Sequence, residues 1–488
     1  MSITSNHKTM VAITDIDGIL RGKYVSLEKL IKIKKGGAGF CSVIYGWDSQ
    51  DQCYQNDRNI NVKFTGWHTG YHDIIAKLDS STSRKLVWNN NSLYLMDFPD
   101  SNVCPRNLLK KIIEQANQMG YNPKIAAEYE WFNFRENCHT LSAKNYDPTQ
   151  LRPITEGNFG YSLLRLSQND EYITKIYDSM NSSKIPIECF HTETGPGVLE
   201  VALKYCDALE MADRAVIFKH GVKEIASQFG IIPTFMAKWN ENLPGSGCHI
   251  HQSLESNSNS KNVFYDNTTS NNANSDNVNS DSTDSTNLDN TPSDNTPSDN
   301  TPSDNTTSDN TTLDNIHMSD TMKHYLAGQL HCLPYILPFF APNVNSYKRL
   351  VDGYWAPTRV GWGIENRTGT HRIILDGSSG TRIECRVGGA DLNPYLAISA
   401  SIASGLYGIR NQLHLCEPFV GNAYQNDNLE ILPNNLMSAV QKMETSSIAK
   451  ELFGKEFVEH FIATRKWEWK QYNQSVTDWE RKRYMEII

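Results

Sequence analysis

KIAAEYEWFNF, residues 124–134, is the most informative segment of the sequence. Its alternation predicts a β-strand, in which successive side chains point to opposite faces. Glu128 and Glu130 then share one face, while Tyr129 and Trp131 share the other. Neighbouring carboxylates repel each other, so they are stable together either when solvated or when a cation lies between them. A Glu-x-Glu pair on its own more often marks a sheet face exposed to water. Charged residues further along this chain favour the other interpretation, in which a cation lies between the two carboxylates.

The composition is that of a globular protein. The chain has 488 residues, 39% of them hydrophobic, which is enough for about three domain-sized units around a large core. Residues 256–316 hold ten Asp and one Lys and so account for the whole formal net charge of −9. The rest of the chain is close to neutral and has no basic arm or stripe, so we expect no nucleic-acid partner.

The ten cysteines and the apolar runs indicate where the protein works. The cysteines are scattered without a close pair, which is typical of reduced thiols rather than a disulfide framework. The N-terminus lacks the apolar run of a signal peptide, and no later run is apolar enough to span a membrane. We therefore expect a soluble, cytoplasmic protein without a membrane partner.

Hydrophobic periodicity predicts a small mixed-sheet region followed by a larger one. Strands are expected at residues 10–20, 39–44, 92–98 and 124–134 and twice within 186–202; helices are expected at 27–33, 105–119, 206–230, 321–333, 393–408 and through most of 448–488. Residues 256–316 contain tandem pentads such as TPSDN with almost nothing to bury. Such a segment cannot offset its ordering entropy, so we expect a disordered insertion in a surface loop.

Five segments carry charged residues of the kinds that metal and phosphate chemistry needs. They are Glu128 with Glu130, Glu193 with Glu200, His249 and His251 with Ser253, the arginines Arg349, Arg367, Arg372, Arg382 and Arg386, and Glu384. Five Glu and one His can form two sites of three ligands each for Mg²⁺, leaving positions for substrate oxygens. Arginine forks bind carboxylate and phosphate. Neither a P-loop nor a kinase catalytic loop is present, so a nucleotide must bind by another arrangement.

Each of these segments also has a structural interpretation. Glu193 and Glu200 could be loop-surface charges, His249 and His251 could be ordinary strand histidines, and the arginines near Glu384 could form surface ion pairs. Independent coincidence in all five segments is the weaker hypothesis. The residues alone therefore predict an enzyme that handles phosphate with two metal ions.

Several longer motifs resemble the signature segments of the glutamine synthetase family, type I branch. They are the Glu-x-Glu strand, HTETGPGVLE, GSGCHIHQS, NSYKRL followed by GYWAP, ENRTGTHR, RIECR and GADLNPYLA. The terminal segments TDIDGILRGK and SVTDWERKRYMEII are similar to those of the branch that includes γ-glutamyl-polyamine synthetases and related glutamate–amine ligases. The resemblance covers nearly the whole chain outside residues 256–316.

The resemblance implies an α+β fold and a reaction. Residues 1–104 would form an N-terminal β-grasp domain, and residues 105–488 a large catalytic α/β domain with an antiparallel sheet, interrupted by the disordered insertion. ATP would phosphorylate the γ-carboxylate of L-glutamate, and ammonia or a primary amine would then displace phosphate. The family also implies a homo-oligomer, a dodecamer of stacked rings whose sites are shared between subunits, and Mg²⁺ or Mn²⁺ with two ions per site.

The matched motifs also imply residue roles. Glu130, Glu193 and Glu200 would hold one ion, and Glu128, His249 and Glu384 would hold the other. Glutamate would be bound by Gly245, Arg349 and Arg386, and the nucleotide would be contacted by His251 and Ser253. Phosphate would be neutralised by Arg367, Arg372 and Arg382, of which Arg372 and Arg382 would also reach the nucleotide, and the amine would be received by Asp48 or Asp51 at a neighbouring subunit's site.

Two positions depart from the glutamine-forming members of the family. Pro244 stands where those members usually carry Asn beside the glutamate loop. They carry a Glu in the flap after the Gly-Tyr pair, where this chain has Trp355. A Trp excludes water and stacks on an alkyl chain but cannot accept a proton, which favours an amine over ammonia as the nitrogen donor. Drift within an ammonia-using enzyme is the competing interpretation. A second alternative is a structural or regulatory member that has lost catalysis, although all six metal-ligand positions are retained.

Overall fold

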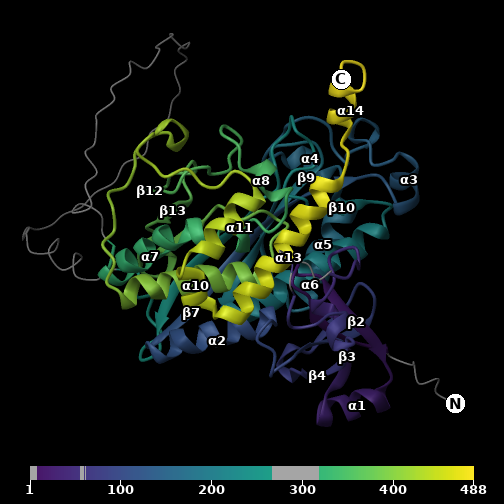
Figure 1. Cartoon of the computed structure of the whole chain (residues 1–488), viewed down its shortest axis with the longest axis horizontal. Helices are drawn as coiled ribbons and strands as arrows, with labels where there is room; N and C mark the ends of the chain where they lie inside the picture. Colours follow the sequence, from purple (N-terminus) through teal and green to yellow (C-terminus); the bar gives the residue numbers. More distant parts are fainter. Residues whose placement is uncertain (1–7, 55–59, 61, 266–317) are drawn as a thin grey trace, which may run out of the picture.

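The computed structural model describes residues 8–54, 60, 62–265 and 318–488 (Figure 1). Two sheets organise these residues. The first lies in the N-terminal region and the second forms the centre of the larger region, where helices cover it.

The N-terminal sheet has the β-grasp arrangement. Its strands run in the order β2-β1-β6-β4-β3, with β5 also paired to β6, and β1 and β6 are parallel neighbours. Helix α1 begins after Ser26, whose side chain accepts a hydrogen bond from Lys29 N, and it buries Leu30 and Ile33 against the sheet. The bounds are β1 (Thr9–Thr14), β2 (Leu20–Val25), α1 (Leu27–Gly36), β3 (Ala38–Cys41), β4 (Asp73–Leu78), β5 (Arg84–Leu86) and β6 (Asn91–Asp97).

The second sheet runs in the order β12-β13-β14-β11-β7-β9-β8, with β10 also paired to β7. Every pair in it is antiparallel except β12 with β13. The expected antiparallel catalytic sheet is therefore confirmed, with one parallel edge strand. The bounds are β7 (Tyr121–Phe134), β8 (Ile187–Thr192), β9 (Val198–Asp207), β10 (Ile232–Thr234), β11 (Cys248–Ser256), β12 (Trp362–Ile364), β13 (His371–Ile374) and β14 (Arg382–Cys385).

Helices cover one face of this sheet and leave the other face open. Helices α2 and α6 pack on β7, and α10 packs on α2, α6 and α7. Tyr129 and Trp131 are fully buried in the core beneath the helices, whereas Glu128 and Glu130 on the opposite face stay partly exposed. The predicted alternation along residues 124–134 is confirmed. The covering helices are α2 (Pro105–Gln118), α6 (Ala208–Ser227), α7 (Asp320–Ile336) and α10 (Pro394–Arg410).

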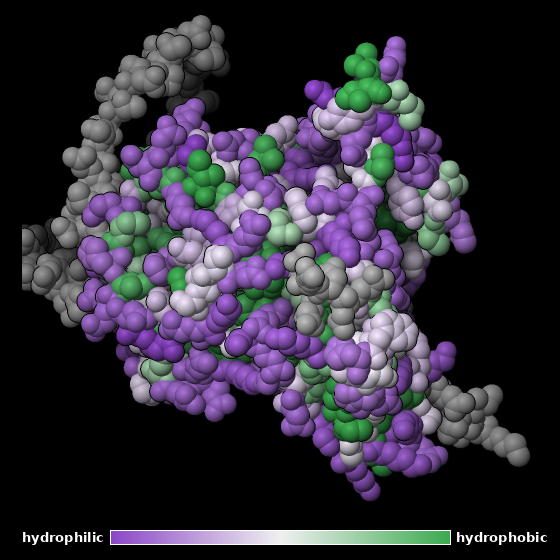
Figure 2. Space-filling model, viewed as in Figure 1, coloured by the Kyte–Doolittle hydropathy of each residue, from purple (hydrophilic) through white to green (hydrophobic). Residues whose placement is uncertain are grey.

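The remaining helices complete the larger region. They are α3 (Cys138–Ala143), α4 (Leu163–Ser167), α5 (Asp170–Ser182), α8 (Ser346–Arg349), α9 (Gly377–Gly380), α11 (Leu436–Thr445), α12 (Ile448–Phe453), α13 (Lys455–Gln474) and α14 (Asp478–Tyr484). Figure 2 shows a largely hydrophilic surface, with apolar residues gathered at the projecting C-terminal end, where Ile487 and Ile488 are exposed. No helix in the described ranges is long and apolar enough to cross a membrane.

Several predicted boundaries need correction. The strand expected over residues 10–20 ends at Thr14, and a turn separates it from β2, which begins at Leu20. The strand expected over residues 39–44 ends at Cys41, and a short 3₁₀ helix follows it. The helix expected from residue 206 begins at Ala208, because Cys206 still belongs to β9. The insertion was expected from residue 256, but residues 256–265 are structured. Phe264 is fully buried against Tyr325, and Tyr265 forms a bridge with Met318. The rest of the predicted insertion, residues 266–316, lies outside the described residues.

The N-terminal region docks on the larger one through both apolar and polar contacts, and Ile16 and Leu95 belong to the core of the larger region. Asp17 Oδ1 lies 2.6 Å from Arg465 Nη2 on α13, and Asn393 Nδ2 donates to the carbonyl oxygens of Asp15 and Ile16. Helix α2 begins at Pro105, and the predicted domain division between residues 104 and 105 stays a prediction.

Candidate active site

Strand register gathers the predicted metal ligands on the open face of the second sheet. On β7, Glu128 lies opposite His249 of β11, and Glu130 lies opposite Glu200 of β9. On the other side of β11, His251 lies opposite Glu384 of β14. Like charges directly opposite each other destabilise a sheet, so positive charge near Glu130 and Glu200 stabilises their pairing.

The first group of donors consists of Glu128, His251 and Glu384, whose ligand atoms all lie within 4.8 Å of one another. His249 adjoins it, because its Nδ1 lies 3.1 Å from Glu128 Oε2 and 3.6 Å from Glu384 Oε1. Burial opposes ionisation of Glu384, yet the positive charge of Arg386 lowers its pKa to about 2. Burial and Arg386 together lower the pKa of His249, which keeps this imidazole neutral and able to coordinate a cation.

The second group consists of His191, Glu193 and Glu200. His191 Nε2 lies 3.3 Å from Glu200 Oε1, and Glu130 Oε2 accepts a hydrogen bond of 2.7 Å from Gly247 N beside them. Burial raises the pKa of Glu200 to about 7 and also raises the pKa of Glu130. Buried carboxylates with raised pKa values gain most from a nearby cation.

The two groups fit divalent cations that prefer oxygen ligands. Together they offer carboxylates and imidazoles from five strands, β7, β8, β9, β11 and β14. They fill only part of a coordination sphere, as Mg²⁺ and Mn²⁺ sites in substrate-binding enzymes do. His251 Nε2 is buried without a well-aligned hydrogen bond, although it lies 2.9 Å from Glu128 Oε1. A cation between these two atoms would satisfy both.

The predicted arginines surround the first group. Arg372 Nη1 donates to Glu384 Oε2 at 2.9 Å, and Arg386 Nη1 donates to Glu384 Oε1. Arg382 Nε lies 3.3 Å from His251 Nδ1. Arg367 joins them through its backbone, because its carbonyl oxygen accepts a hydrogen bond of 3.2 Å from Arg386 Nε.

Arg349 lies at the other end of the site against a glycine loop. It is buried, and its guanidinium donates to the carbonyl oxygens of Arg386 and Val387. A Cβ at Gly245 would lie 2.8 Å from the Arg349 side chain, and a Cβ at Gly247 would lie 2.8 Å from Arg349 Nη2 and 2.9 Å from His249 Nε2. Glycine is therefore needed at both positions for close approach.

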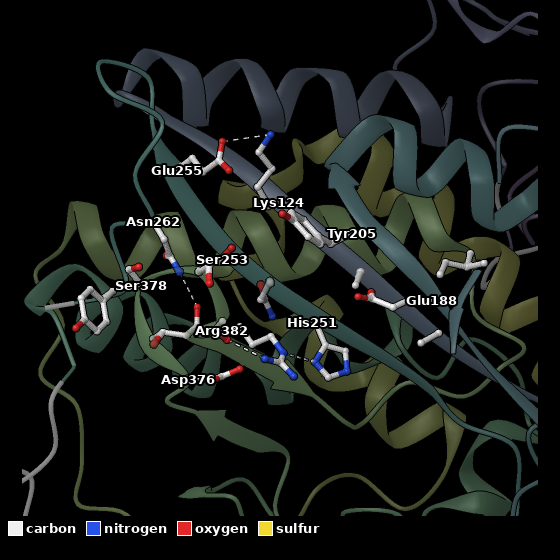
Figure 3. Close-up of a pocket in the computed structure, with 18 of the residues that line it drawn as sticks. Lys124, Glu188, Tyr205, His251, Ser253, Glu255, Asn262, Asp376, Ser378 and Arg382 are labelled. Atoms are coloured by element: carbon white, nitrogen blue, oxygen red, sulfur yellow. Dashed lines mark hydrogen bonds and ion pairs between the residues drawn. The ribbon is translucent and has the colours of Figure 1, made fainter. Parts of the chain in front are cut away.

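A cavity of about 840 Å³ opens beside the first group, and His251, Ser253 and Arg382 line it together with Lys124 and Asn262 (Figure 3). Its size is that of a site for a small organic ligand. Three of the four residues predicted to contact a nucleotide thus line one cavity next to the donors predicted to hold an ion, and the fourth, Arg372, does not line it.

Asp48 and Asp51 lie elsewhere in the chain. Asp48 Oδ2 accepts a hydrogen bond from Trp467 Nε1, and Asp51 Oδ1 lies 2.6 Å from Arg21 Nη1. Neither belongs to the two donor groups. Their predicted role at a neighbouring subunit's site stays a prediction.

Two residues of the site were missed in the sequence. His191 belongs to the second donor group, and its position two residues before Glu193 on a strand was a usable signal. Tyr161 stacks on His191 with ring centroids 4.5 Å apart, and burial together with the charges of Glu193 and Glu200 raises its pKa. No pattern in the irregular segment around Tyr161 indicated this contact.

The fold and the site together place two candidate metal-binding groups and several arginines on one face of a sheet, an arrangement that fits an enzyme acting on anionic substrates. Comparison with known proteins then defines the family. The family described as "Glutamine synthetase, catalytic domain" matches residues 102–280 and 302–484. The chain therefore belongs to the glutamine synthetase family, and it is an ATP-dependent carbon–nitrogen ligase.

Individual relatives include both glutamine synthetases and amine ligases. The chain is 44% identical to type-1 glutamine synthetase 2 of Dictyostelium discoideum, over 100% of the chain and 85% of that relative. It is 33% identical to a glutamate–isopropylamine ligase of a Pseudomonas species, over 97% of the chain and 94% of that relative. A solved structure of GmaS with ADP has a TM-score of 0.76 at 24% identity, covering 98% of this chain and 97% of the other, and so shares the fold.

Proposed function

We propose that the protein joins the γ-carboxylate of L-glutamate to ammonia or a primary amine, through a γ-glutamyl phosphate formed from ATP. The observation that carries the proposal is the gathering of all six predicted ligands on one sheet face, with Arg372 and Arg386 bonded to Glu384. Overall the carbon–nitrogen bond forms as the carbon–oxygen bond to phosphate breaks, and ADP, phosphate and a proton are released.

In this proposal the six predicted ligands would hold two Mg²⁺ or Mn²⁺ ions. Glu130, Glu193 and Glu200 would hold one of them, on the glutamate side, and Glu128, His249 and Glu384 would hold the other, on the nucleotide side. The ions supply positive charge that offsets the negative charge of phosphate as the phosphoryl group moves. The protein's own contribution is to fix the carboxylates on rigid strands and so position both anions.

The remaining polar residues divide between the two substrates. Arg349 and Arg386 form bidentate contacts with the α-carboxylate of glutamate, beside Gly245. Arg367, Arg372 and Arg382 neutralise charge on the transferring phosphate, as such transfers require. His251 and Ser253 contact the nucleotide in the cavity of about 840 Å³, which Arg382 also lines.

We propose a primary amine as the preferred donor. Trp355 occupies the flap position with a positive φ of 61°, and its side chain is 61% exposed. An indole cannot accept a proton from ammonium, but it can cover an alkyl group. Relatives 33% and 31% identical to the chain are named for isopropylamine and for γ-glutamylethanolamide.

The quaternary structure and location complete the proposal. We propose a homo-oligomer, a dodecamer, in which Asp48 or Asp51 of one subunit lies at the acceptor side of its neighbour's site. We place the enzyme in the cytoplasm, in line with its ten cysteines, all of them in the described part of the chain and all free thiols.

A donor screen tests the proposal. Phosphate release and γ-glutamyl products are measured with glutamate, ATP, Mg²⁺ and either ammonium or a panel of primary amines, and turnover with amines should exceed that with ammonium. Arg349→Ala should abolish turnover without changing oligomer size, whereas the matched control Arg359→Ala, whose guanidinium lies 3.6 Å from exposed Asp427, should not. Equal or better turnover with ammonium removes the amine preference, and no ATP hydrolysis with any donor favours a structural protein of the same fold.

A further inference from the structure

Lys238 is a buried lysine at the glutamate end of the site, and none of the roles proposed above uses it. It lies between β10 and the glycine loop (residues 240–247) and is 7% exposed. Among the described residues its ammonium has two polar contacts. Nζ donates to the carbonyl oxygen of Leu243, and it lies 4.1 Å from the ring centroid of Tyr354 in the flap (residues 352–356). A buried cation is costly unless its surroundings compensate the charge, so both contacts are important for its position.

The first contact fixes the glycine loop. Lys238 Nζ binds the middle of this loop at Leu243. A Cβ at Gly245 would lie 2.3 Å from the carbonyl oxygen of Ala237 and 2.8 Å from Arg349 Cγ. The end of the loop is therefore held between the residue that precedes Lys238 and the side chain that we assign to glutamate.

The backbone of Lys238 fixes the start of α8. Lys238 N donates to Asn345 Oδ1 at 2.9 Å, and Asn345 Nδ2 donates to the carbonyl oxygen of Lys238 at 2.7 Å. Asn345 directly precedes α8, the short helix that ends at Arg349. The next residue, Trp239, packs on Phe134 of β7 with ring centroids 4.7 Å apart. The second sheet thus sets the position of Lys238, and Lys238 sets the position of α8.

The second side-chain contact holds the flap. Tyr354 is half-buried with its ring facing Lys238, whereas Trp355 beside it is 61% exposed. Ala356 is fully buried, and its carbonyl oxygen accepts a hydrogen bond of 3.1 Å from the Tyr424 hydroxyl. The hydroxyl of Tyr354 has no hydrogen bond among the described residues, so its ring is the part that holds this end of the flap.

From these contacts we infer that Lys238 is a positioning residue that ties the flap to the glycine loop and to α8. The three segments around glutamate are then held as one unit by a single side chain and its backbone. The inference rests on the proposed ligase function and adds to it the residue that couples glutamate binding to the position of the flap. Lys238 itself acts through Tyr354, Leu243 and Asn345.

A displaced flap has a chemical consequence for the proposed reaction. Closed active sites exclude water and so prevent hydrolysis of reactive intermediates. When water reaches γ-glutamyl phosphate, it attacks the γ-carbonyl carbon, the carbon–oxygen bond to phosphate breaks, and glutamate, phosphate and a proton are released. Loss of the contact between Lys238 and Tyr354 therefore yields phosphate without amide.

Three variants test the inference, each assayed for KM for glutamate, KM for ATP and phosphate released per γ-glutamyl amide. Lys238→Met removes the charge, Tyr354→Leu removes the ring, and Tyr354→Phe removes only the hydroxyl. The first two should each raise KM for glutamate about tenfold and leave KM for ATP within about twofold. They should release at least about two phosphates per amide, against about one in the wild type. Tyr354→Phe should equal the wild type.

A double variant shows whether the ammonium and the ring act as a pair. Lys238→Met combined with Tyr354→Leu should lower kcat/KM for glutamate no more than the worse single variant, whereas independent effects multiply to about 100-fold. Lys34→Met is the matched control, because Lys34 Nζ lies 4.8 Å from the ring centroid of Tyr94 in the N-terminal sheet region. It should leave all three quantities as in the wild type.

Several results overturn the role of Lys238 while leaving the ligase intact. They are effects that multiply in the double variant, a Tyr354→Leu variant equal to the wild type, and a Tyr354→Phe variant as impaired as Tyr354→Leu. If Lys238→Met does not fold, the two variants at half-buried Tyr354 decide the matter. Absence of turnover by the wild type with every donor overturns the proposed function as well.

Discussion

Glu128→Gln removes one carboxylate donor and keeps the size of the side chain. The two carboxylate oxygens of Glu128 lie 2.9 Å from His251 Nε2 and 3.1 Å from His249 Nδ1, so this residue connects both imidazoles to the first donor group. In the variant, Glu384 is the one carboxylate that remains in that group. Removing a residue that merely supports a metal ligand lowers affinity 10- to 100-fold. Loss of a direct donor should therefore lower affinity by about 100-fold or more, which is about 2.7 kcal/mol.

The assay is a count of bound Mn²⁺ ions from the loss of the free-ion electron paramagnetic resonance signal. At concentrations that saturate the wild type, the wild-type protein should bind two ions per chain and Glu128→Gln should bind one. Glu255→Gln is the control, because Glu255 is on the neighbouring strand β11 but pairs with Lys124 at 3.2 Å. If Glu128→Gln binds Mn²⁺ as the wild type does, the first donor group is not a cation site and the reasoning is refuted.

Three further variants test other parts of the structure. Burial and the charge of Arg465 lower the pKa of His460 to about 3, whereas in the unfolded state it is about 6.5. As the pH falls, the unfolded state therefore binds a proton at His460 before the folded state does, and the free energy of unfolding decreases below about pH 6.5. His460→Phe should remove about 2 kcal/mol of the stability loss between pH 7 and pH 5, measured by urea unfolding at both pH values. Arg106→Met leaves the buried carboxylate of Asp213 without its ion pair, because the Arg106 guanidinium donates to both carboxylate oxygens at 2.9 Å. The free energy of unfolding in the same assay should fall by about 3–5 kcal/mol. A decrease below about 1 kcal/mol would contradict this prediction. Glu365→Gln releases the guanidinium of Arg372, whose Nε donates to Glu365 at 2.8 Å, and should lower kcat about tenfold with little change in KM for ATP, seen in steady-state kinetics.

Much of the fold and part of the site followed from local pattern. The period of two along residues 124–134 placed Glu128 and Glu130 on one face and Tyr129 and Trp131 in the core, as the structure confirms. Strand alternation works here because one face is covered by helices and the other is open. Glu193 and Glu200, which flank the Gly-Pro-Gly segment of HTETGPGVLE, likewise lie together in the structure.

Other features depend on contacts that no local pattern encodes. The pairing of Glu130 with Glu200 follows from strand register, which the sequence does not specify. A cavity that Trp355 and Phe419 line combines segments more than fifty residues apart, since Phe419 comes from a separate loop. The insertion boundary was misplaced because composition was averaged over residues 256–316. The apolar run at Val263 and Phe264 was a local signal that this part is packed.

The central claim is that two cations bind on one face of the second sheet. Anomalous diffraction from crystals of the protein grown with Mn²⁺ tests it most directly. The account predicts two anomalous peaks per chain at about 2.1 Å from their ligand oxygens, one beside Glu128 and Glu384 and the other beside Glu193 and Glu200. Peaks away from these carboxylates, or none on this face, would contradict it.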